Sequence, residues 1–309
     1  MEAPLVSVVV VTYNSSKTIL DTLNSIAAQT YKNIELIVSD DCSKDSTVQI
    51  CQEWLGNHKS RFINTELLTV EVNTGTTRNL NRGYEKSKGI WIKGIAGDDV
   101  LMNNCIQQNV EFIKLHPSVE ILFSKVKIIG DGDIIYMHRK LFKYGAFKLS
   151  NKEQLYLLLT TNFVPASTCF IKKDVFESLG RFDEKIPLLE DWPFWIKSLI
   201  KGKTLSFNDE YSVLYRMSDC SISLTTKINP LYEQSMRIFE SEYLLYYQRK
   251  VNLLLWFYYR CILLGVRKPM WKKFLLGFLI LINPIFYYIK YLKVKSNYNY
   301  DLMDDKITF

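Results

Sequence analysis

The chain up to about residue 130 alternates between short apolar runs and segments whose apolar residues recur at helical spacing. The run at residues 6–11 is rich in Val and carries no charge, which is typical of a strand buried on both faces of a sheet. Apolar residues at helical spacing follow between Ile19 and Ala27, after a Ser pair that can cap a helix. Further strands are expected at residues 34–38, 64–72, 90–95 and 119–129, with helices at 45–55, 77–88 and 102–115. Repeated strand–helix units predict an α/β fold with a mostly parallel, doubly wound sheet flanked by helices.

The pattern loosens after residue 130 and becomes largely helical near the C-terminus. Two Gly-Asp pairs at residues 130–133 predict a turn, interpreted as a hairpin. Helices are then expected at residues 152–159, 173–179 and 191–201, and strands at 168–171 and 211–217. Long helices are expected after about residue 225, two of them in the apolar stretches 253–266 and 274–289.

Charge is divided unevenly between the two parts of the chain. Residues 1–224 carry 26 basic and 26 acidic residues, whereas residues 225–309 carry 13 and 6 and therefore hold the whole net charge of +7. This tail is also rich in aromatic residues, Leu and Ile, which favours a membrane surface as partner over nucleic acid. Its apolar stretches are shorter than the roughly 20 residues of a spanning helix, so we expect them to lie in or dip into the interface. A helical cap on the core and a dimer surface are the alternatives.

Several classes of protein are disfavoured by motifs that the sequence lacks. No GxGxxG or GxxxxGK[ST] loop follows the first strand, which argues against a dinucleotide-dependent dehydrogenase and a P-loop kinase. The three histidines lie outside the site motifs, which disfavours a His-based zinc site or a Ser–His hydrolase. Six cysteines without a CxxC pair are interpreted as free thiols in a reducing cytosol, and the N-terminus shows no secretory signal.

Polar and acidic residues stand at the ends of three predicted strands. Thr12 and Asn14 follow the first strand, Asp40 and Asp41 the second, and a pair of aspartates at 98–99 the fourth. Ligands of an open parallel sheet bind at the carboxyl ends of its strands. Carboxylates gathered there repel one another and raise each other's pKa unless a cation is present. The pattern therefore predicts a hard-cation site with hydrogen-bond acceptors for a hydroxyl-rich ligand.

Five motifs of the chain resemble those of family 2 glycosyltransferases in their order and spacing. They are VSVVVVTYN ending at Asn14, DDCSKD from Asp40, NTG from Asn73 with Arg78-Asn79, GDD ending at Asp99, and Glu190-Asp191. Each motif alone is weak, but the five in order are specific, and the resemblance covers residues 4–220.

The resemblance implies a GT-A-like fold and a division of the chain. We expect a catalytic domain at residues 1–225, with a nucleotide-binding half at about 1–100 and an acceptor half at about 101–225. A helical, basic and aromatic extension that associates with membranes is expected at residues 226–309.

The resemblance also implies which residues hold the nucleotide-sugar. Asp41 corresponds to the carboxylate that hydrogen-bonds the nucleotide base, and Thr12 and Asn14 line the same pocket. Arg78 corresponds to an arginine near the base and the diphosphate, and Asp40 has a supporting role. The alternatives are a turn-forming role for Asp41 and a solvated helix charge for Arg78.

In this resemblance the aspartate pair at 98–99 binds the ribose and the metal. Asp98 corresponds to the ligand of the ribose hydroxyls and Asp99 to the ligand of Mn²⁺ or Mg²⁺. Most family members place a third aspartate where this chain has Gly97, and a His where it has Ser218, so two contacts of the family pattern are missing. A helix-capping pair is the alternative.

Asp191 corresponds to the general base of an inverting transfer. A sugar hydroxyl is a poor nucleophile near neutral pH, so a carboxylate must take its proton opposite the leaving diphosphate. Glu190 is expected to support this site, and Trp192 is expected either to stack on a sugar or to fill the core. A capping role at the start of a helix is the alternative for Asp191.

The sequence thus predicts an inverting, metal-dependent glycosyltransferase acting in the assembly of a surface polysaccharide such as O-antigen or capsule. The predicted donor is a UDP-sugar, and the predicted acceptor is a saccharide on a polyprenyl diphosphate. We expect peripheral or monotopic attachment to the cytoplasmic face of the plasma membrane, without nucleic-acid binding. A non-catalytic module that binds a sugar nucleotide or a glycan in a membrane assembly is the alternative.

Overall fold

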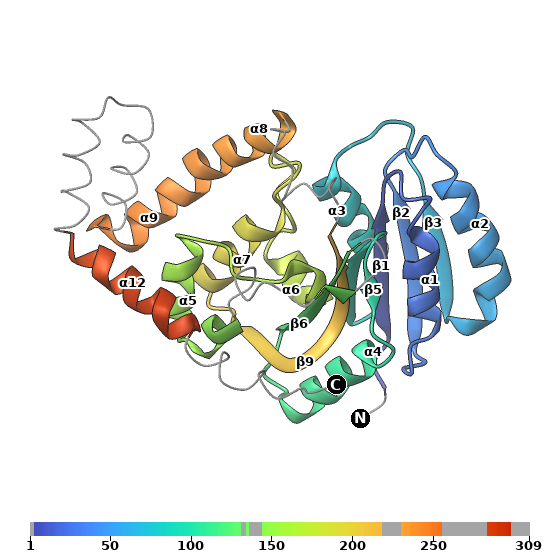
Figure 1. The fold of residues 1–309 in the computed structure, drawn as a ribbon, viewed down its shortest axis with the longest axis horizontal. Helices are drawn as coiled ribbons and strands as arrows, with labels where there is room; N and C mark the ends of the chain where they lie inside the picture. The colour runs from blue at the N-terminus through green and yellow to red at the C-terminus, as the bar shows by residue number, and fades with distance from the viewer. Residues whose placement is uncertain (1–2, 131–133, 136–143, 218–229, 255–282, 298–309) are drawn as a thin grey trace.

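The computed structural model describes residues 3–130, 134–135, 144–217, 230–254 and 283–297, and one large sheet runs through it with helices on both faces (Figure 1). The sheet order is β3-β2-β1-β4-β8-β6-β9-β5, and β7 pairs with β6. The strands are β1 (Val6–Thr12), β2 (Ile34–Asp40), β3 (Asn64–Leu68), β4 (Trp91–Ala96), β5 (Val100–Leu101), β6 (Ile121–Ile129), β7 (Ile134–Ile135), β8 (Phe170–Lys172) and β9 (Leu205–Arg216). The helices of eight residues or more are α1 (Ile19–Ala27), α2 (Thr47–His58), α3 (Thr76–Lys86), α4 (Cys105–Leu115), α5 (Asn151–Leu158), α7 (Asp191–Ile200), α8 (Pro230–Ile238) and α12 (Pro284–Asn297). Shorter helical segments are η1 (Lys59–Arg61), η2 (Tyr144–Lys148), η3 (Ala166–Thr168), α6 (Lys173–Ser178), η4 (Phe239–Leu244) and α9 (Leu245–Val251).

The first four strands of this order form the parallel half of the sheet. β1 pairs in parallel with β2 on one side and β4 on the other, and β2 pairs in parallel with β3. The register sets Thr12 at the end of β1 opposite Asp40 at the end of β2. The predicted alternation of strands and helices is confirmed here, although β3 ends at Leu68 and not near residue 72.

Alternate residues of β1 enter two different cores, because successive side chains of a strand point to opposite faces. Val9 packs with Tyr84 of α3 in one core. Val8 and Val10 pack with Leu23 of α1 in the other. Each fully buried Val or Leu contributes about 1.5–3 kcal/mol to the free energy of unfolding. The two cores together fix the sheet between its helical layers.

The second half of the sheet adds antiparallel strands to the parallel frame. β8 pairs antiparallel with β4 and with β6, β9 runs parallel to β6, and β5 pairs antiparallel with β9. β6 and β7 form an antiparallel pair at the hairpin predicted around residues 130–133, of which 131–133 lie outside the described residues. The predicted α/β class is confirmed: β8 corresponds to the strand expected at residues 168–171 and β7 to the expected hairpin, whereas β5 was not expected.

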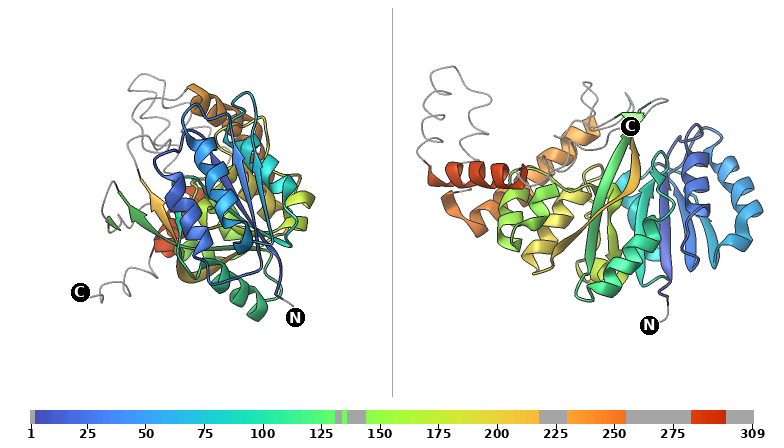
Figure 2. Two further views of the ribbon diagram at one scale, coloured as in Figure 1. Left: turned by 90° about the vertical axis from the view of Figure 1, so that its right-hand side faces the viewer. Right: turned by 60° about the horizontal axis from the view of Figure 1, so that its bottom comes forward.

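The described helices of the C-terminal extension pack against the acceptor half of the chain, and α9 and α12 lie at the end of the molecule far from α1 and α2 (Figures 1 and 2). Phe239, Leu244, Ile285, Ile289 and Leu292 are buried in the same core that contains α5 and α7. In this part the alternative prediction of a helical cap on the core is confirmed. Among the described residues, no helix is long and apolar enough to cross a membrane. The predicted apolar helices at 253–266 and 274–289 lie mostly outside the described residues.

Helix α5 connects this extension to the rest of the fold. It begins with a capping box, in which the Ser150 side chain accepts a hydrogen bond from the Glu153 N–H and the Glu153 side chain accepts one from the Ser150 N–H. Glu153 also pairs with Lys295 of α12 at 3.0 Å. Glu153 therefore caps the start of α5 and also pairs with α12.

We expect Phe239→Ala to lower the free energy of unfolding by about 3–5 kcal/mol, because it removes a fully buried ring from a packed core. The measurement is urea unfolding followed by circular dichroism. Tyr246→Ala is the matched control, since Tyr246 is a neighbouring aromatic residue that is 54% exposed and should change stability by less than about 0.5 kcal/mol. Equal effects of the two changes would mean that the extension does not share the core.

Candidate active site

The carboxyl ends of β1, β2 and β4 meet at one edge of the sheet. The N–H of Asp41 donates to the carbonyl of Thr12 at 3.0 Å, and the N–H of Gly97 donates to the carbonyl of Val11 at 2.9 Å. The loops that follow the three strands are therefore in direct contact. The structure brings Thr12, Asp41 and the loop at residues 97–99 together, as the parallel sheet predicted.

Asn14 joins the loop after β1 to the loop after β2. Its N–H donates to the Ser43 hydroxyl at 2.8 Å, and its Oδ1 accepts the N–H of Lys44 at 2.8 Å. Its φ of +51° lies in the left-handed region, which Asn tolerates better than most residues. Asn14 therefore shapes the edge at which the nucleotide is predicted to bind.

Asp41 is 2% exposed, and its carboxylate is used within the protein. Oδ2 accepts the N–H groups of Thr74 at 2.9 Å and Gly75 at 2.7 Å, and Oδ1 accepts the Thr74 hydroxyl at 2.6 Å. Arg82 pairs with Oδ1 at 3.3 Å. These contacts hold the loop before α3, which lies 33 or 34 positions further along the chain, so they are not the local turn that was the alternative. A hydrogen bond from Asp41 to a nucleotide base would have to share these oxygens, and it stays a prediction.

Two arginines of α3 have different surroundings. Arg78 is exposed and pairs with Glu184 at 3.2 Å, an arrangement that contributes little in water. Arg82, one turn later, pairs with Asp41 and donates to the carbonyl of Asp40 at 3.4 Å. Arg82 is therefore the α3 arginine that reaches the strand ends, whereas the predicted Arg78 lies further out.

Asp40 supports the turn after β2. It is fully buried, its Oδ1 accepts the N–H of Ser43 at 2.8 Å, and its Oδ2 accepts the Ser43 hydroxyl. Asp40 therefore supports the site by stabilising the turn that leads to Ser43.

Asp98 and Asp99 form a partly buried acidic pair at the end of β4. Burial raises the pKa of Asp98, and burial together with the charge of Asp98 raises the pKa of Asp99 to about 8. Arg216 of β9 opposes both shifts: its backbone N–H donates to Oδ1 of Asp99 at 2.9 Å and its Nε donates to the carbonyl of Asp98 at 2.9 Å. Arg216 also pairs with Asp21 at 2.9 Å. Burial therefore disfavours two negative charges on this pair unless a cation is bound nearby.

Lys93 places a buried ammonium group beneath this edge. It is fully buried in β4, and it donates to one backbone carbonyl in β4 and one in η3. Burial lowers the pKa of Lys93, and Asp99 opposes this shift. Burial raises the pKa of the Cys169 thiol to about 12, and that thiol lies in the fields of both Lys93 and Asp191. Lys93 thus lies near Asp99, and Cys169 lies near both Lys93 and Asp191.

Asp191 and Glu190 form a second partly buried acidic pair at the start of α7. Burial raises the pKa of Asp191, and a hydrogen bond from Asn162 Nδ2 to its Oδ2 at 2.9 Å opposes the shift. Burial and the charge of Asp191 raise the pKa of Glu190 to about 7. A carboxylate whose pKa is raised toward neutrality is a stronger proton acceptor, which is the property that a general base needs.

Trp192 packs inside the protein. Its indole N–H donates to the carbonyl of Leu158 at 2.7 Å, and its ring lies 4.8 Å from that of Phe239. These contacts support the core-filling alternative for Trp192 over stacking on a sugar.

Helix α3 joins the strand-end loops to the segment that leads to Asp191. The Thr77 N–H donates to the carbonyl of Pro187 at 3.2 Å, and Asn81 Nδ2 donates to the carbonyl of Phe182 at 3.0 Å. Asp41 holds the loop just before α3, so α3 connects Asp41 with the segment at residues 182–187. The two predicted halves of the site are therefore parts of one packed arrangement.

The aspartate pair at the end of β4 is chemically suited to a divalent cation. Among the described residues, no cluster of three or more His, Cys, Asp or Glu is placed to hold a metal. Mg²⁺ is commonly held by one or two carboxylates, with water and substrate phosphates completing its coordination. Asp98 and Asp99 supply two such carboxylates, and a cation would relieve the repulsion between them.

Gly97 stands where the family resemblance implies a third aspartate. A Cβ at this position would lie 2.9 Å from Thr12 Oγ1 and 3.2 Å from Ile19 Cδ1. The Thr18 hydroxyl donates to the Gly97 carbonyl at 2.9 Å, which holds the backbone in place. The close approach of β1 therefore leaves no room for a side chain at residue 97.

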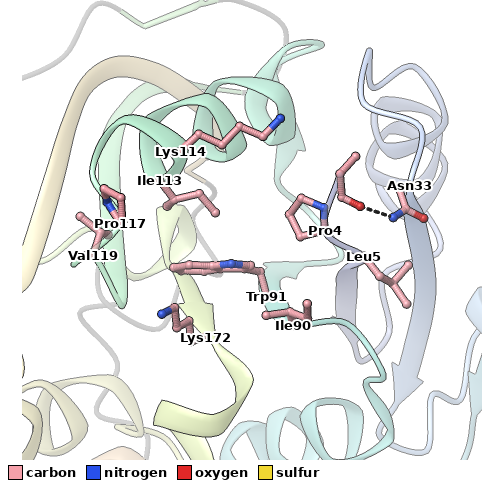
Figure 3. A pocket seen from close by; sticks show the side chains of 11 residues that line it. Pro4, Leu5, Asn33, Ile90, Trp91, Ile113, Lys114, Pro117, Val119 and Lys172 are labelled. Carbon is pink, nitrogen blue, oxygen red and sulfur yellow. Dashed lines mark hydrogen bonds between the residues drawn. The ribbon is translucent and has the colours of Figure 1, made fainter. Parts of the chain in front are cut away.

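A hollow of about 520 Å³ lies at the opposite, amino end of the strands (Figure 3). Trp91, the first residue of β4, lies between Ile113 and Lys172 at its floor, and Pro4 and Lys114 stand at its rim. No predicted site residue lines this hollow. The candidate active site is therefore the acidic edge at the carboxyl ends of the strands.

Four polar residues at this edge were not predicted from the sequence. They are Arg82, Lys93, Asn162 and Arg216. A Lys inside an apolar strand is a signal that could have identified Lys93, and Arg216 stands two positions before Ser218, where the family resemblance places a His. Arg82 and Asn162 stand in no recognisable pattern, and only the structure identifies them.

The fold has a counterpart among solved structures. The structure resembles residues 1–349 of S. aureus TarS, solved in complex with UDP-GlcNAc, with a TM-score of 0.60 and 18% identity over 94% of this chain and 89% of that one. The GT-A-like fold predicted from the sequence is thereby confirmed.

Sequence comparison identifies the family. The glycosyl transferase family 2 model matches residues 7–180, and the chain belongs to that family. An uncharacterized glycosyltransferase of Rickettsia typhi is 28% identical over 233 residues, which cover 75% of this chain and 69% of the relative. One of Methanocaldococcus jannaschii is 26% identical over 220 residues, 70% of this chain and 72% of the relative. Other relatives are longer: the match spans 37% of a Rickettsia bellii glycosyltransferase. The predicted glycosyltransferase class is confirmed.

We expect Gly97→Asp to destabilise the protein by about 1–3 kcal/mol, although it would supply the family's third carboxylate, because the new side chain overpacks the contact with Thr12. The measurement is the midpoint and slope of urea unfolding. Gly56→Ala is the matched control, since an added Cβ meets nothing there and Ala favours the helix by about 0.5–1 kcal/mol. A Gly97→Asp protein as stable as the wild type would contradict the steric explanation.

Proposed function

We propose that this family 2 glycosyltransferase moves a sugar, with inversion, from a UDP-sugar to a saccharide hydroxyl and uses Mn²⁺ or Mg²⁺. The observation that carries the proposal is the acidic pair Asp98–Asp99 at the strand edge, joined through Thr12 and α3 to the second acidic pair at 190–191. One pair is suited to a cation and the other to proton transfer. An inverting transfer uses a base for the acceptor hydroxyl and positive charge for the leaving diphosphate.

The residues of the chain divide the reaction between them. Asp191 takes the proton of the acceptor hydroxyl as its oxygen attacks the anomeric carbon, and the bond to the diphosphate breaks on the opposite face. Asp98 and Asp99 would hold the divalent cation, which when bound neutralises charge that develops on the diphosphate. Asp98 would also bind ribose hydroxyls. Glu190, with a pKa raised to about 7 by burial and by Asp191, would share protons with the base or orient the acceptor.

The UDP part of the proposal rests on the structural likeness to TarS, which was solved with UDP-GlcNAc. Thr12, Asn14 and Asp41 stand at the edge where the base would lie, and Arg78 is the exposed cation at the start of α3. Arg82 would help to keep Asp41 in place. The identity of the sugar is left open by these residues.

The proposed acceptor is a saccharide carried on a polyprenyl diphosphate at the cytoplasmic face of the membrane, as in O-antigen or capsule synthesis. What supports it is an exposed stripe on α12, formed by Tyr287, Tyr291 and Val294 at helical spacing with Lys290 beside them. Aromatic and basic residues together favour the membrane interface. The four described cysteines are free and buried, in keeping with a reducing compartment.

A non-catalytic module that binds a sugar nucleotide or a glycan is the second candidate. The observation on its side is that the Asp41 carboxylate is engaged within the protein and that Gly97 leaves out a carboxylate of the family pattern. The raised pKa of Asp191, caused by burial, and the amide that holds it favour turnover instead.

We expect the purified protein to release UDP from UDP-GlcNAc or a related UDP-sugar in the presence of Mn²⁺, and Asp191→Asn to lower kcat by about 10²-fold or more. The amide keeps the size of the carboxylate but cannot accept the proton. UDP affinity, measured by calorimetry, should stay within about threefold of the wild-type value, which is below 1 kcal/mol.

Asp99→Asn provides the companion measurement, because it should weaken the dependence of activity on Mn²⁺ without moving the base. Binding of UDP-sugars without release of UDP by the wild type would favour the non-catalytic module. An Asp191→Asn protein with wild-type kcat would remove Asp191 as the base.

We expect the double change Tyr287→Ser and Tyr291→Ser to reduce binding to vesicles that contain phosphatidylglycerol by about tenfold, because two exposed rings no longer enter the interface. Co-sedimentation measures the bound fraction. Leu115→Ser with Ile63→Ser is the matched control, since both residues are exposed and apolar but lie on other elements. Surface changes are preferable to truncation, because Ile285 and Leu292 of the same helix are buried in the core. Unaltered vesicle binding by the double variant would contradict this use of α12.

A further inference from the structure

Asn162 lies in the segment between α5 and η3, and its side-chain amide bridges two groups. Nδ2 donates to Oδ2 of Asp191 at 2.9 Å, and Oδ1 accepts the backbone N–H of Val164 at 3.1 Å. A backbone N–H can only donate, so it fixes the amide oxygen on the side of Val164. The amide NH₂ must then face the carboxylate. The local turn thus determines which end of Asn162 meets Asp191.

This contact distinguishes the two oxygens of the Asp191 carboxylate. Oδ2 accepts the Asn162 amide, and holding it limits rotation of the carboxylate about its terminal bond, a torsion that is otherwise broad. Oδ1 is left free of this contact, and the indole of Trp195 and the backbone N–H of Trp192 also lower the pKa of the Asp191 carboxyl group. A general base must lie within hydrogen-bond distance of the proton that it removes, so its orientation contributes to rate as well as its basicity.

The surroundings of Asp191 contain few other groups that could orient it by charge. The titratable groups that face it are Glu190 beside it in the chain, Cys169 just before β8 and Tyr232 of α8. None of the three carries a positive charge when ionised. The neutral amide of Asn162 is therefore suited to hold the carboxylate without neutralising it.

We propose that Asn162 is a positioning residue for the catalytic base: its amide holds Oδ2 of Asp191 so that Oδ1 faces the acceptor hydroxyl. The inference rests on the proposed role of Asp191 as general base. It assigns a function to a residue outside every motif of the sequence.

Two substitutions separate positioning from a purely structural role. Asn162→Ala removes both contacts of the side chain, whereas Asn162→Asp keeps an acceptor for the Val164 N–H and replaces the donor to Asp191 with a second carboxylate. Asn151→Ala is the matched control, because Asn151 is also partly buried and hydrogen-bonded, to Thr204 at 3.1 Å, away from Asp191. A purely structural role, through Val164 alone, predicts that the Asp191 carboxyl group titrates at the same pH in Asn162→Ala as in the wild type.

We expect both changes at Asn162 to lower kcat for UDP release from UDP-GlcNAc by about 10- to 100-fold, with KM for the donor changed by less than about threefold. The kinetic experiment measures kcat and KM between about pH 5 and pH 9. A general base acts in its ionised form, so activity falls as the pH drops through its pKa. Loss of a hydrogen bond to the ionised form raises the pKa of Asp191, so the acidic limb of kcat/KM should move to higher pH. Repeating the series in Glu190→Gln separates the titration of Glu190 from that of Asp191.

A direct titration keeps the test independent of turnover. With ¹³C-labelled aspartate and the Asp191 signal assigned through Asp191→Asn, the midpoint of the Asp191 carboxyl titration should rise in Asn162→Ala and stay unchanged in Asn151→Ala. Unchanged kcat and an unchanged midpoint in both Asn162 variants would overturn the inference. A shifted midpoint together with an active Asp191→Asn protein would instead overturn the proposed role of Asp191 and leave the contact intact.

Discussion

The parallel pairing of β1 with β2 and β4 is the interaction on which the rest of the structure depends. These strands are buried on both faces, so their peptide groups must pair with neighbouring strands, because a buried unpaired N–H or carbonyl is costly. Parallel pairing aligns the strand ends and thereby brings Thr12, Asp41 and the 97–99 loop from separate stretches of sequence to one edge. The position of the donor side of the site follows from strand direction, before any polar contact is considered.

Helix α3 connects these strand ends to the acceptor half of the chain. Asp41 and Arg82 hold the loop before the helix, and Thr77 and Asn81 on the helix bind the segment that leads to Asp191. Apart from the Arg82–Asp41 ion pair, these contacts are hydrogen bonds that involve backbone groups, and their directional geometry fixes position more closely than apolar packing alone. The base and the acidic pair of β4 are consequently held in one frame although different elements supply them.

The buried carboxylates determine the chemical properties of the site, because the cations near them offset only part of the cost of burying their charge. Burial raises the pKa of Asp98, Asp99 and Glu190; Arg216 opposes the shift at Asp98, and Lys93 and Arg216 oppose it at Asp99. A ligand that brings a cation would be stabilised by the first pair, and a ligand that donates a proton would be stabilised by the second. Perturbed carboxylates of this kind are a frequent property of functional sites.

The sequence by itself determined the alternation of strands and helices, the parallel frame and the strand-end residues Thr12, Asp41 and Asp98, because hydrophobic period and chain order are local properties. Only the tertiary structure decided that Arg82 and not Arg78 reaches the strand ends, that Asn162 holds Asp191, and that the described C-terminal helices share the main core. The partners in these contacts are far apart in the chain: Asp41 and Arg82 by 41 positions, Asn162 and Asp191 by 29, Glu153 and Lys295 by 142. Such pairings depend on how whole elements pack, and no periodicity of the sequence encodes which two side chains will meet.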